Sequence, residues 1–213
     1  MKSRSPQDMD LYQDRFQAYE AAGVLLASPE MQPEDWEWAW APYSEADYRA
    51  VLGLLHHQDV VLDIGAGDLR FAFAAAKIVR RVYAIEIQDA LLRQALRRYP
   101  TPENLIIIHA DARRVDFPEG VSVGVLMMRH CSYFRLYAEK LRRAGARRLI
   151  TNARWRMGLE EIDLNQPRIY YPAAQPGWYA CWCGRVGFKA GDLPGEARED
   201  CVQEVIYCPD CSG

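Results

Sequence analysis

The chain has 213 residues, about half of them apolar, and a formal net charge of -3. This length suffices for one α/β domain with a small appendage, and the apolar share excludes a chain disordered by composition. The net charge gives no whole-protein signature of nucleic-acid binding. The first residues lead into polar sequence rather than an apolar signal-peptide core, and no apolar run is long enough to span a bilayer. We therefore expect a cytoplasmic protein without a membrane partner, whose six cysteines are thiols or metal ligands rather than disulfides.

The first part of the chain, residues 1–43, is expected to form a helical and tryptophan-rich cover. It holds a predicted helix over residues 11–26, which is followed by a stretch rich in tryptophan. A second helix should begin after Ser44, because Ser44 and Asp47 have the spacing of a capping box before the apolar positions of residues 48–55.

The central part, residues 44–156, alternates short apolar runs with amphipathic segments. The runs are apolar on both faces, as in strands buried in a parallel sheet. The segments between them have helical spacing, with basic residues near their C-terminal ends, where the helix dipole favours them. The runs cover residues 60–62, 82–85, 105–108, 121–128 and 149–150, and the helical segments include residues 69–79, 90–98 and 133–143. Five such alternations predict a doubly wound, mostly parallel α/β sheet.

The most informative motif follows the first apolar run and reads Asp63-Ile64-Gly65-Ala66-Gly67. Glycines let the backbone turn tightly and approach a ligand where a Cβ would collide. The turn falls at the carboxyl edge of the sheet, at the topological switch point where such sheets bind ligands. The next run ends in Glu86, 21 residues after Gly65, and a carboxylate there can accept both hydroxyls of a ribose. The motif therefore predicts a nucleotide cofactor.

Two nucleotide cofactors fit this outline. The dinucleotide fingerprint needs a glycine at the place of Arg70, which weakens the case for NAD and leaves an NAD-dependent oxidoreductase as the alternative enzyme. The acidic Asp63 before the glycines suits an ammonium group better than a pyrophosphate. An ammonium at this turn and a ribose at Glu86 describe S-adenosylmethionine.

The stretch from residue 44 to 152 resembles the class I S-adenosylmethionine-dependent methyltransferases, whose fold is Rossmann-like. The glycine-rich turn matches the loop that holds the methionine part of the cofactor in that family, and Leu69 stands where many members have a third glycine. Glu86 matches the acidic residue that closes the second strand, and the segment 109–112 matches the one whose aspartate contacts the adenine amino group. The resemblance implies methyltransferase activity and a cofactor site made of Asp63, Gly65, Gly67, Glu86, Ile87, Asp111 and Ala112.

The residues after the fourth apolar run are expected to face the methyl acceptor. Methyl transfer is an in-line displacement, so alignment and exclusion of water supply much of the acceleration. We expect His130 to act as a base or to orient the acceptor, with Arg129 and Tyr133 shaping the pocket; the alternative is that His130 only caps the next helix or bonds to backbone. Cys131 is either a nucleophile or a small core residue. The chain lacks the Asn/Asp-Pro-Pro-aromatic motif of family members that act on exocyclic amines of bases, which disfavours that acceptor class.

The last part, residues 157–213, is expected to form a separate module that resembles a zinc ribbon. Two close cysteine pairs, separated by 24 residues, could together form a tetrahedral structural zinc site without an open position. The predicted ligands are Cys181, Cys183, Cys208 and Cys211. Strands are expected at residues 185–189 and 202–207. Two alternatives stay open, Cys201 as a substitute ligand and ordinary unligated thiols, and the module could either complete the sheet edge or stand apart.

Two classes of methyl acceptor remain open, RNA and a small molecule. Residues 135–156 hold eight basic side chains against Glu139 alone, a pattern that could follow a phosphate backbone or form a solvated face. The aromatic side chains Trp36, Trp38, Trp40 and Tyr43 could wall a small-molecule site or only fasten the N-terminal segment to the core. A non-catalytic subunit that binds S-adenosylmethionine is the alternative to an enzyme, and the sequence leaves the oligomeric state unknown.

Overall fold

The computed structural model describes residues 17, 19–27, 31, 39–98, 100–129, 131–154, 158–191 and 202–211. Four residues named above lie outside these ranges, namely Trp36, Trp38, His130 and Cys201, as does Arg156, the last of the eight basic residues in 135–156. The predicted helix over 11–26 lies partly outside them too. Its described helical residues are 17 and 19–21, whereas Leu26 forms an isolated parallel bridge with Trp40, so the helix ends earlier than expected. Among the described helices, none combines the length and apolarity that a bilayer crossing requires.

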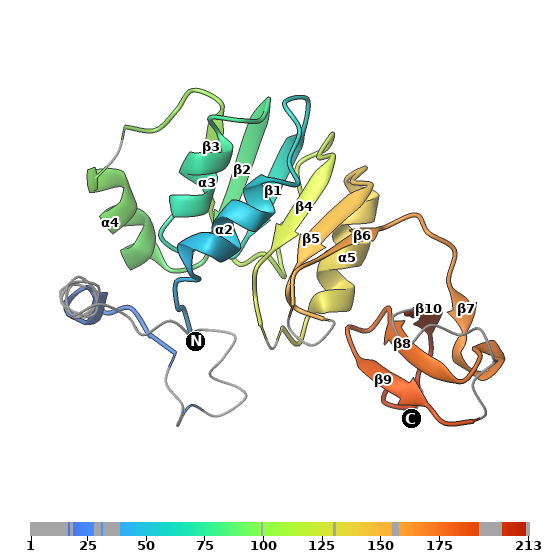
Figure 1. Cartoon of the computed structure of the whole chain (residues 1–213). Coiled ribbons are helices and arrows are strands. Elements are labelled where there is room, and N and C mark those ends of the chain that lie inside the picture. The colour runs from blue at the N-terminus through green and yellow to red at the C-terminus, as the bar shows by residue number, and fades with distance from the viewer. Residues whose placement is uncertain are drawn as a thin grey trace.

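A six-stranded sheet forms the centre of the molecule (Figure 1). Its strand order is β3-β2-β1-β4-β5-β6, with β1 to β5 parallel and β6 antiparallel to β5. The strands are β1 (Val60–Ile64), β2 (Arg81–Glu86), β3 (Leu105–His109), β4 (Val123–Leu126), β5 (Arg148–Thr151) and β6 (Glu160–Asp163). Each predicted apolar run thus overlaps a strand, and the prediction of a doubly wound, mostly parallel sheet is confirmed.

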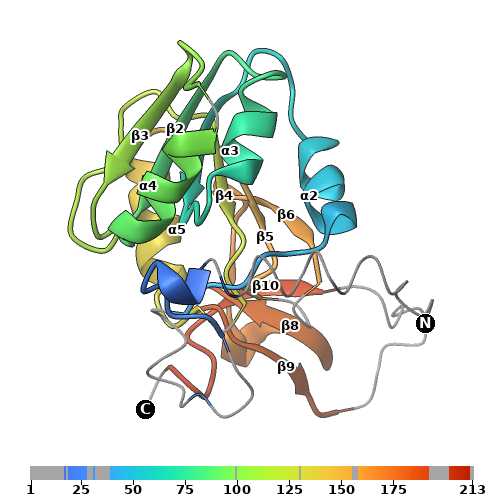
Figure 2. The ribbon, with the colours of Figure 1, turned by 90° about the vertical axis from the view of Figure 1, so that its left-hand side faces the viewer.

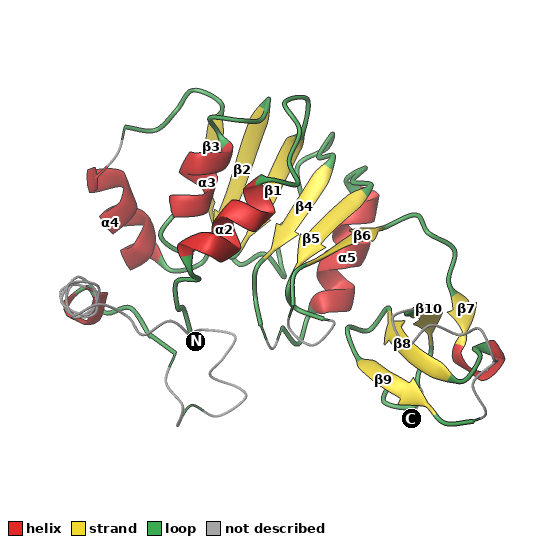
Figure 3. Ribbon diagram, in the orientation of Figure 1, coloured by secondary structure: helices red, strands yellow, loops and turns green. Residues whose placement is uncertain are grey.

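Helices cover both faces of this sheet (Figures 2 and 3). They are α2 (Glu45–Leu52), α3 (Arg70–Ala75), α4 (Asp89–Arg98) and α5 (Phe134–Arg143). One apolar core joins α2, α3 and α4 to one face, and a second core joins α5 to the other. The connection from β3 to β4 consists of turns without a helix. One of the expected strand–helix alternations therefore lacks its helix.

Local sequence explains where α2 and α3 begin. The Ser44 hydroxyl accepts the backbone N–H of Asp47 at 3.1 Å, and the Asp47 carboxylate accepts the backbone N–H of Ser44 at 3.1 Å, which confirms the capping box. Leu69 precedes α3 with φ +61°, the left-handed conformation that a glycine would supply, and its side chain is fully buried. Burial of the leucine side chain offsets the backbone strain, so α3 starts normally without the third glycine.

The C-terminal module has a four-stranded sheet of its own, with strand order β7-β10-β8-β9. It contains β7 (Ile169–Tyr170), the 3₁₀ helix η3 (Tyr171–Ala173), β8 (Gly177–Cys181), β9 (Val186–Lys189) and β10 (Gln203–Ile206). The two strands expected in this module are present. The expected start of the module at residue 157 needs a correction, because β6 pairs with β5 and extends the main sheet to Asp163. The edge of the main sheet is therefore closed by β6, and the module sheet stands apart from it.

Buried contacts fix the module against the loop after β5 and the start of α5. The Arg154 guanidinium, 1% exposed, donates to Glu160 on β6 at 3.1 Å and to Glu204 on β10 at 2.9 Å. The Trp182 ring meets Phe134 edge-on, with centroids 6.4 Å apart. Both the module and the N-terminal segment lie on the side of the carboxyl ends of the parallel strands (Figures 1 and 2).

Candidate functional site

A cavity of about 490 Å³ opens at the carboxyl edge of β1, β2 and β4. The turn after β1, the end of β2 and the segment after β3 line one side, and the segment 39–44 lies across them. Most of the predicted cofactor residues meet here, namely Asp63, Gly65, Glu86, Ile87, Asp111 and Ala112. Gly67 does not line the cavity.

Asp63 supplies a buried carboxyl group, one oxygen of which lacks a hydrogen-bond partner among the described residues. The residue is 3% exposed, and its Oδ2 accepts no hydrogen bond from any described residue. Desolvation, together with the charges of Glu86 and Asp68, raises the pKa of Asp63 to about 8. A cation of the ligand placed against this oxygen would complete its interactions, since unpaired buried carboxylates are unfavourable.

Glu86 is held in place by the backbone. Its Oε2 accepts the N–H of Gly67 at 2.7 Å and its Oε1 accepts the N–H of Gln88 at 2.8 Å. Burial raises the pKa of Glu86, and these backbone amides oppose the shift. The carboxylate is thus positioned at the end of β2 before any ligand binds, and its remaining lone pairs can accept hydroxyl groups.

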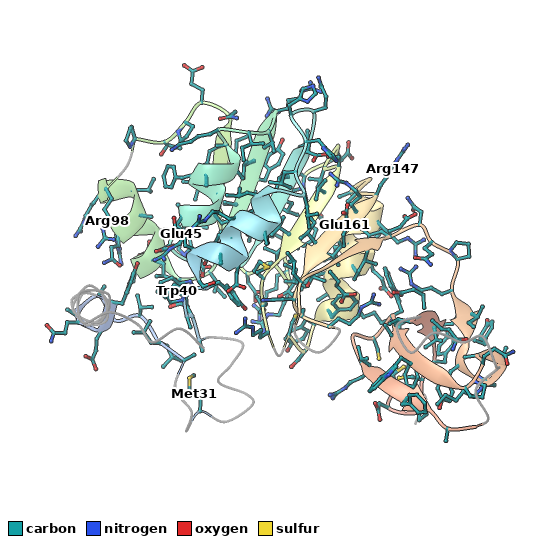
Figure 4. All side chains as sticks on the ribbon, viewed as in Figure 1. Met31, Trp40, Glu45, Arg98, Arg147 and Glu161 are labelled. Carbon is teal, nitrogen blue, oxygen red and sulfur yellow. The ribbon has the colours of Figure 1, made fainter. Side chains whose placement is uncertain are left out.

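The two glycines adopt the left-handed conformation that the motif predicts, with φ +72° at Gly65 and φ +57° at Gly67. Their close neighbours are side chains of this chain. A Cβ on Gly65 would stand 2.8 Å from Cε of Met128, and a Cβ on Gly67 would stand 2.1 Å from Nε1 of Trp40. Figure 4 shows Trp40 below Glu45 at the start of α2. At Gly67, the absence of a side chain therefore makes room for Trp40 rather than directly for a ligand.

The segment after β3 is braced from two sides. The Arg113 guanidinium donates to both oxygens of Asp111, with Nε–Oδ1 at 2.9 Å and Nη2–Oδ2 at 2.8 Å, and this pairing lowers the pKa of Asp111. The Lys140 ammonium of α5, 7% exposed, donates to the backbone carbonyls of Ala112 and Val115. The segment expected to face the adenine is thus held by an arginine and by a buried lysine.

Of the two described residues predicted for the acceptor side, one lines the cavity and one does not. Arg129 lines the cavity, and its guanidinium lies 4.9 Å from the centre of the Tyr43 ring. The backbone N–H of Arg129 donates to the Tyr43 hydroxyl at 3.1 Å. Tyr133 does not line the cavity; it precedes α5, and the Arg113 guanidinium lies 5.2 Å from the centre of its ring. His130 is outside the described residues. Cys131 is half-buried and packs against the core beneath α5.

The cavity-lining residues that sequence reasoning missed include Tyr48, Phe71 and Arg113. Tyr48 and Phe71 follow the apolar stripes of α2 and α3, and nothing in the stripe distinguishes a cavity wall from core. Their rings stack, with centroids 6.2 Å apart. Arg113 follows the adenine-side aspartate by two residues, a local spacing that could have suggested the ion pair.

The four cysteines of the module converge on one point. Their Sγ atoms all lie within 4.8 Å of one another. Three of the separations are 3.8 Å for Cys181–Cys211, 3.6 Å for Cys183–Cys208 and 3.7 Å for Cys208–Cys211. A tetrahedral site with zinc–sulfur distances of about 2.3 Å has sulfur–sulfur edges of about 3.8 Å, whereas a disulfide would need about 2.05 Å. The donor set of these four described cysteines therefore fits a four-thiolate zinc ion.

Comparisons with known proteins agree with this geometry. Residues 61–150 match the family model described as a methyltransferase domain. The chain is 42% identical over 65 residues to the probable ribosomal RNA small subunit methyltransferase A of Methanosarcina mazei, a match that covers 30% of this chain and 24% of that protein. The protein of the same name from Thermococcus onnurineus is 45% identical over 65 residues, with the same coverage of 30% and 24%. The chain thus spans about a quarter of the length of these curated relatives.

Among solved structures, phosphoethanolamine N-methyltransferase 1 of Haemonchus contortus, in complex with phosphoethanolamine and S-adenosylhomocysteine, is 23% identical and has a TM-score of 0.42. That match covers 51% of this chain and 26% of the other. The family match coincides with β1 to β5 and the cavity at their carboxyl edge. Residues 61–150, which hold the parallel strands and the cavity at their carboxyl edge, are thus similar to a methyltransferase domain.

Proposed function

We propose that the whole chain transfers a methyl group from S-adenosylmethionine to an acceptor at this cavity. The single observation that carries the proposal is the unpartnered Oδ2 of Asp63, buried beside the backbone-held carboxylate of Glu86. A cationic amino-acid end suits Asp63, and a ribose suits Glu86. Asp111 can accept an adenine amino group while it bonds Arg113, because a carboxylate offers about four lone-pair sites. The cofactor supplies an electrophilic methyl group, and the protein supplies alignment.

The acceptor side is proposed to comprise Arg129, His130 and Tyr133. The position of Arg129 in the cavity wall and of Tyr133 beside Arg113 supports this arrangement. His130 follows Arg129 directly in the chain, so it remains the proposed base or orienting group. Substitution of His130 by Ala should spare cofactor affinity and lower turnover; unchanged turnover would remove it from the mechanism.

The test of the proposed function is cofactor binding followed by methyl transfer. S-adenosylhomocysteine should raise the melting temperature of the protein, whereas NADH should not. Labelled S-adenosylmethionine should then pass its methyl group to cell extract separated into RNA, protein and small-molecule pools. Binding without transfer to any pool would favour a non-catalytic subunit. A thermal shift with NADH alone would favour an oxidoreductase and overturn the proposal.

RNA is the acceptor class that we propose first, because the matched relatives are named ribosomal RNA methyltransferases. A small molecule is the second candidate. The aromatic rings of Trp40, Tyr43 and Tyr48 line the cavity and favour a planar or apolar acceptor. The labelled pool separates the two classes.

We also propose that the module binds one structural zinc ion through Cys181, Cys183, Cys208 and Cys211. Their convergence within 4.8 Å supports the site. The module core is small, with Ala174, Tyr179 and Val205 packed around the buried cysteines. Metal binding would therefore supply much of its folding free energy.

A further inference from the structure

The C-terminal module presents two tyrosine rings stacked on each other at the surface. Tyr170 ends β7 and Tyr207 follows β10, two strands that pair in parallel. The ring centroids are 5.7 Å apart with 15° between the planes, and the residues are 62% and 49% exposed. Tyr207 has φ +57°, a conformation that L side chains rarely adopt. Exposed, parallel π-faces of this kind suit a planar, stacking ligand such as a nucleic-acid base.

Positive charge lies at the start of α5, where the main domain contacts the module. Arg135, in the first turn of α5, has a side chain that is 54% exposed and pairs with Glu139 at 2.8 Å. Phe134, the residue before Arg135, meets the Trp182 ring of the module edge-on, and Ile206, which precedes Tyr207, packs against the apolar core that contains Phe134. A phosphate next to the stacked tyrosines would therefore meet a cation.

Arginine and tyrosine also meet at the cavity, a short distance along the chain from α5. Arg113 lies over the Tyr133 ring and Arg129 over the Tyr43 ring. Among the described residues, Arg129 forms no ion pair with a carboxylate, so its charge is available to an anion. Tyr133 and Arg135 are two residues apart, so the start of α5 connects the arginines at the cavity to the tyrosine pair of the module.

The structure also divides the basic stretch of residues 135–154 into inner and outer side chains. Lys140, Arg148 and Arg154 make internal hydrogen bonds and ion pairs. The exposed arginines of the stretch are Arg135, Arg142, Arg143 and Arg147. Arg147 points to solvent at the edge of the sheet opposite the cavity (Figure 4). The outer face of α5 is thus positive, with Arg135 at the end that adjoins the module.

We propose that single-stranded RNA binds across this face, with bases stacked on the pair Tyr170–Tyr207 and phosphates at Arg135 and Arg129. We propose a single strand rather than a duplex, because stacking on the tyrosine rings needs unpaired bases. In a duplex the bases are paired and stacked on one another. The inference rests on the proposed methyltransferase function and deepens it, since the bound strand delivers its acceptor nucleotide to the cavity. It assigns the module a role in substrate binding.

The experiment measures the affinity of the full-length, zinc-loaded protein for a fluorescent single-stranded RNA of about 12 nucleotides. The double variant Tyr170→Ser with Tyr207→Gly removes both rings, and the glycine keeps φ +57° accessible. Phe188→Ser is the matched control, because Phe188 is as exposed as Tyr207, at 49%, but lies on β9 of the same module. We expect the double variant to bind about tenfold more weakly and the control to bind as the wild type does. Arg135→Gln should reduce the slope of log affinity against log salt by about 0.7.

Zinc content and S-adenosylhomocysteine affinity of each variant are measured in parallel, and both should equal those of the wild type. Equal RNA affinity for the double variant and the wild type, or equal affinity for a duplex of the same length, overturns the inference. It is also overturned if the wild type binds S-adenosylhomocysteine but neither binds the RNA nor methylates an RNA pool, and in that case the methyltransferase proposal survives. Failure to bind S-adenosylhomocysteine contradicts the proposed function instead.

Discussion

The indole nitrogen of Trp40 occupies the space that a Cβ on Gly67 would need, at 2.1 Å from the ideal position of that atom. Gly67 also has φ +57°. We therefore expect Gly67→Ala to lower the free energy of unfolding by about 1–3 kcal/mol, through overpacking and backbone strain. Urea denaturation measures the loss.

A double-mutant cycle with Trp40→Ala separates the two causes. Removing the indole should relieve the overpacking, so Gly67→Ala should cost less in the Trp40→Ala background, with a coupling of about 1 kcal/mol or more. Additive losses would show that Trp40 does not hold this position in solution.

The buried carboxyl of Asp63, with its unpartnered Oδ2, predicts a pH-dependent cofactor affinity. Its pKa in the ligand-free protein is about 8, so near neutral pH the carboxyl is mostly protonated and must lose its proton to pair with an ammonium group. Affinity for S-adenosylhomocysteine should therefore rise from about pH 6 to about pH 8, by up to tenfold per unit, and then level off. Calorimetric titration across this range measures it, with Asp63→Asn as the variant that should bind weakly and without this rise.

The raised pKa of Asp63 also makes the stability of the ligand-free protein depend on pH, and this stability falls as the pH rises. The pKa of Asp63 is raised above its ordinary value of 3.8, so the folded state binds more protons than the unfolded state between the two values. The contribution of Asp63 to stability is thus present below pH 3.8 and is lost as the pH rises through about 8. A flat affinity profile and a wild-type profile in Asp63→Asn would both contradict the assignment of this carboxyl to the ammonium.

The fold could be predicted from the sequence where one local pattern decides the outcome. Apolar runs gave β1 to β5, and the Ser44–Asp47 spacing gave the start of α2. The short polar strand β6 was missed, because Glu160–Asp163 has a single buried residue, Ile162, and owes its place to pairing with β5.

The site residues likewise divide into those that a local sequence pattern predicts and those that it does not. The carboxylates at strand ends were predictable, because parallel strands bring their carboxyl ends together. Contacts between distant segments carry no local signal, and they include the packing of Trp40 on Gly67 and the hydrogen bonds of Lys140 to the segment after β3. The basic stretch was predicted as one face, but burial of Arg154 and Lys140 divides it.

The zinc proposal predicts a defined stoichiometry. Purified protein should contain about one zinc ion per chain, and Cys208→Ser with Cys211→Ser should abolish binding, as mass spectrometry of the native protein would show. Cys131→Ser is the control, since this cysteine packs beneath α5 away from the cluster. Full stability of the metal-free protein would contradict a structural role.

The hydrogen bonds of Lys140 predict that its substitution weakens cofactor binding indirectly, without a contact between Lys140 and the cofactor. Lys140→Met keeps much of the side-chain volume but leaves the carbonyls of Ala112 and Val115 without their donor. We expect a loss of about 2 kcal/mol in stability and weaker binding of S-adenosylhomocysteine, because the segment beside Asp111 loses its brace. Arg143→Met, an exposed change three residues later on α5, should leave both measurements unchanged; equal behaviour of the two variants would exclude the bracing role.

Arg154 predicts that the module and the methyltransferase domain unfold together. Its guanidinium is 1% exposed and joins Glu160 of the main sheet to Glu204 of the module. Arg154→Met removes the shared cation from two largely buried carboxylates, of which Glu204 keeps Arg168 at 3.6 Å, at a cost of about 3 kcal/mol. Hydrogen exchange should then show faster opening of β10 than of β4, whereas the wild type protects both. The exposed pair Arg49–Glu45 gives the control, because Arg49→Met should leave exchange at β10 as it is in the wild type. Unchanged protection of β10 in Arg154→Met would mean that the aromatic contact between Trp182 and Phe134 suffices to dock the module.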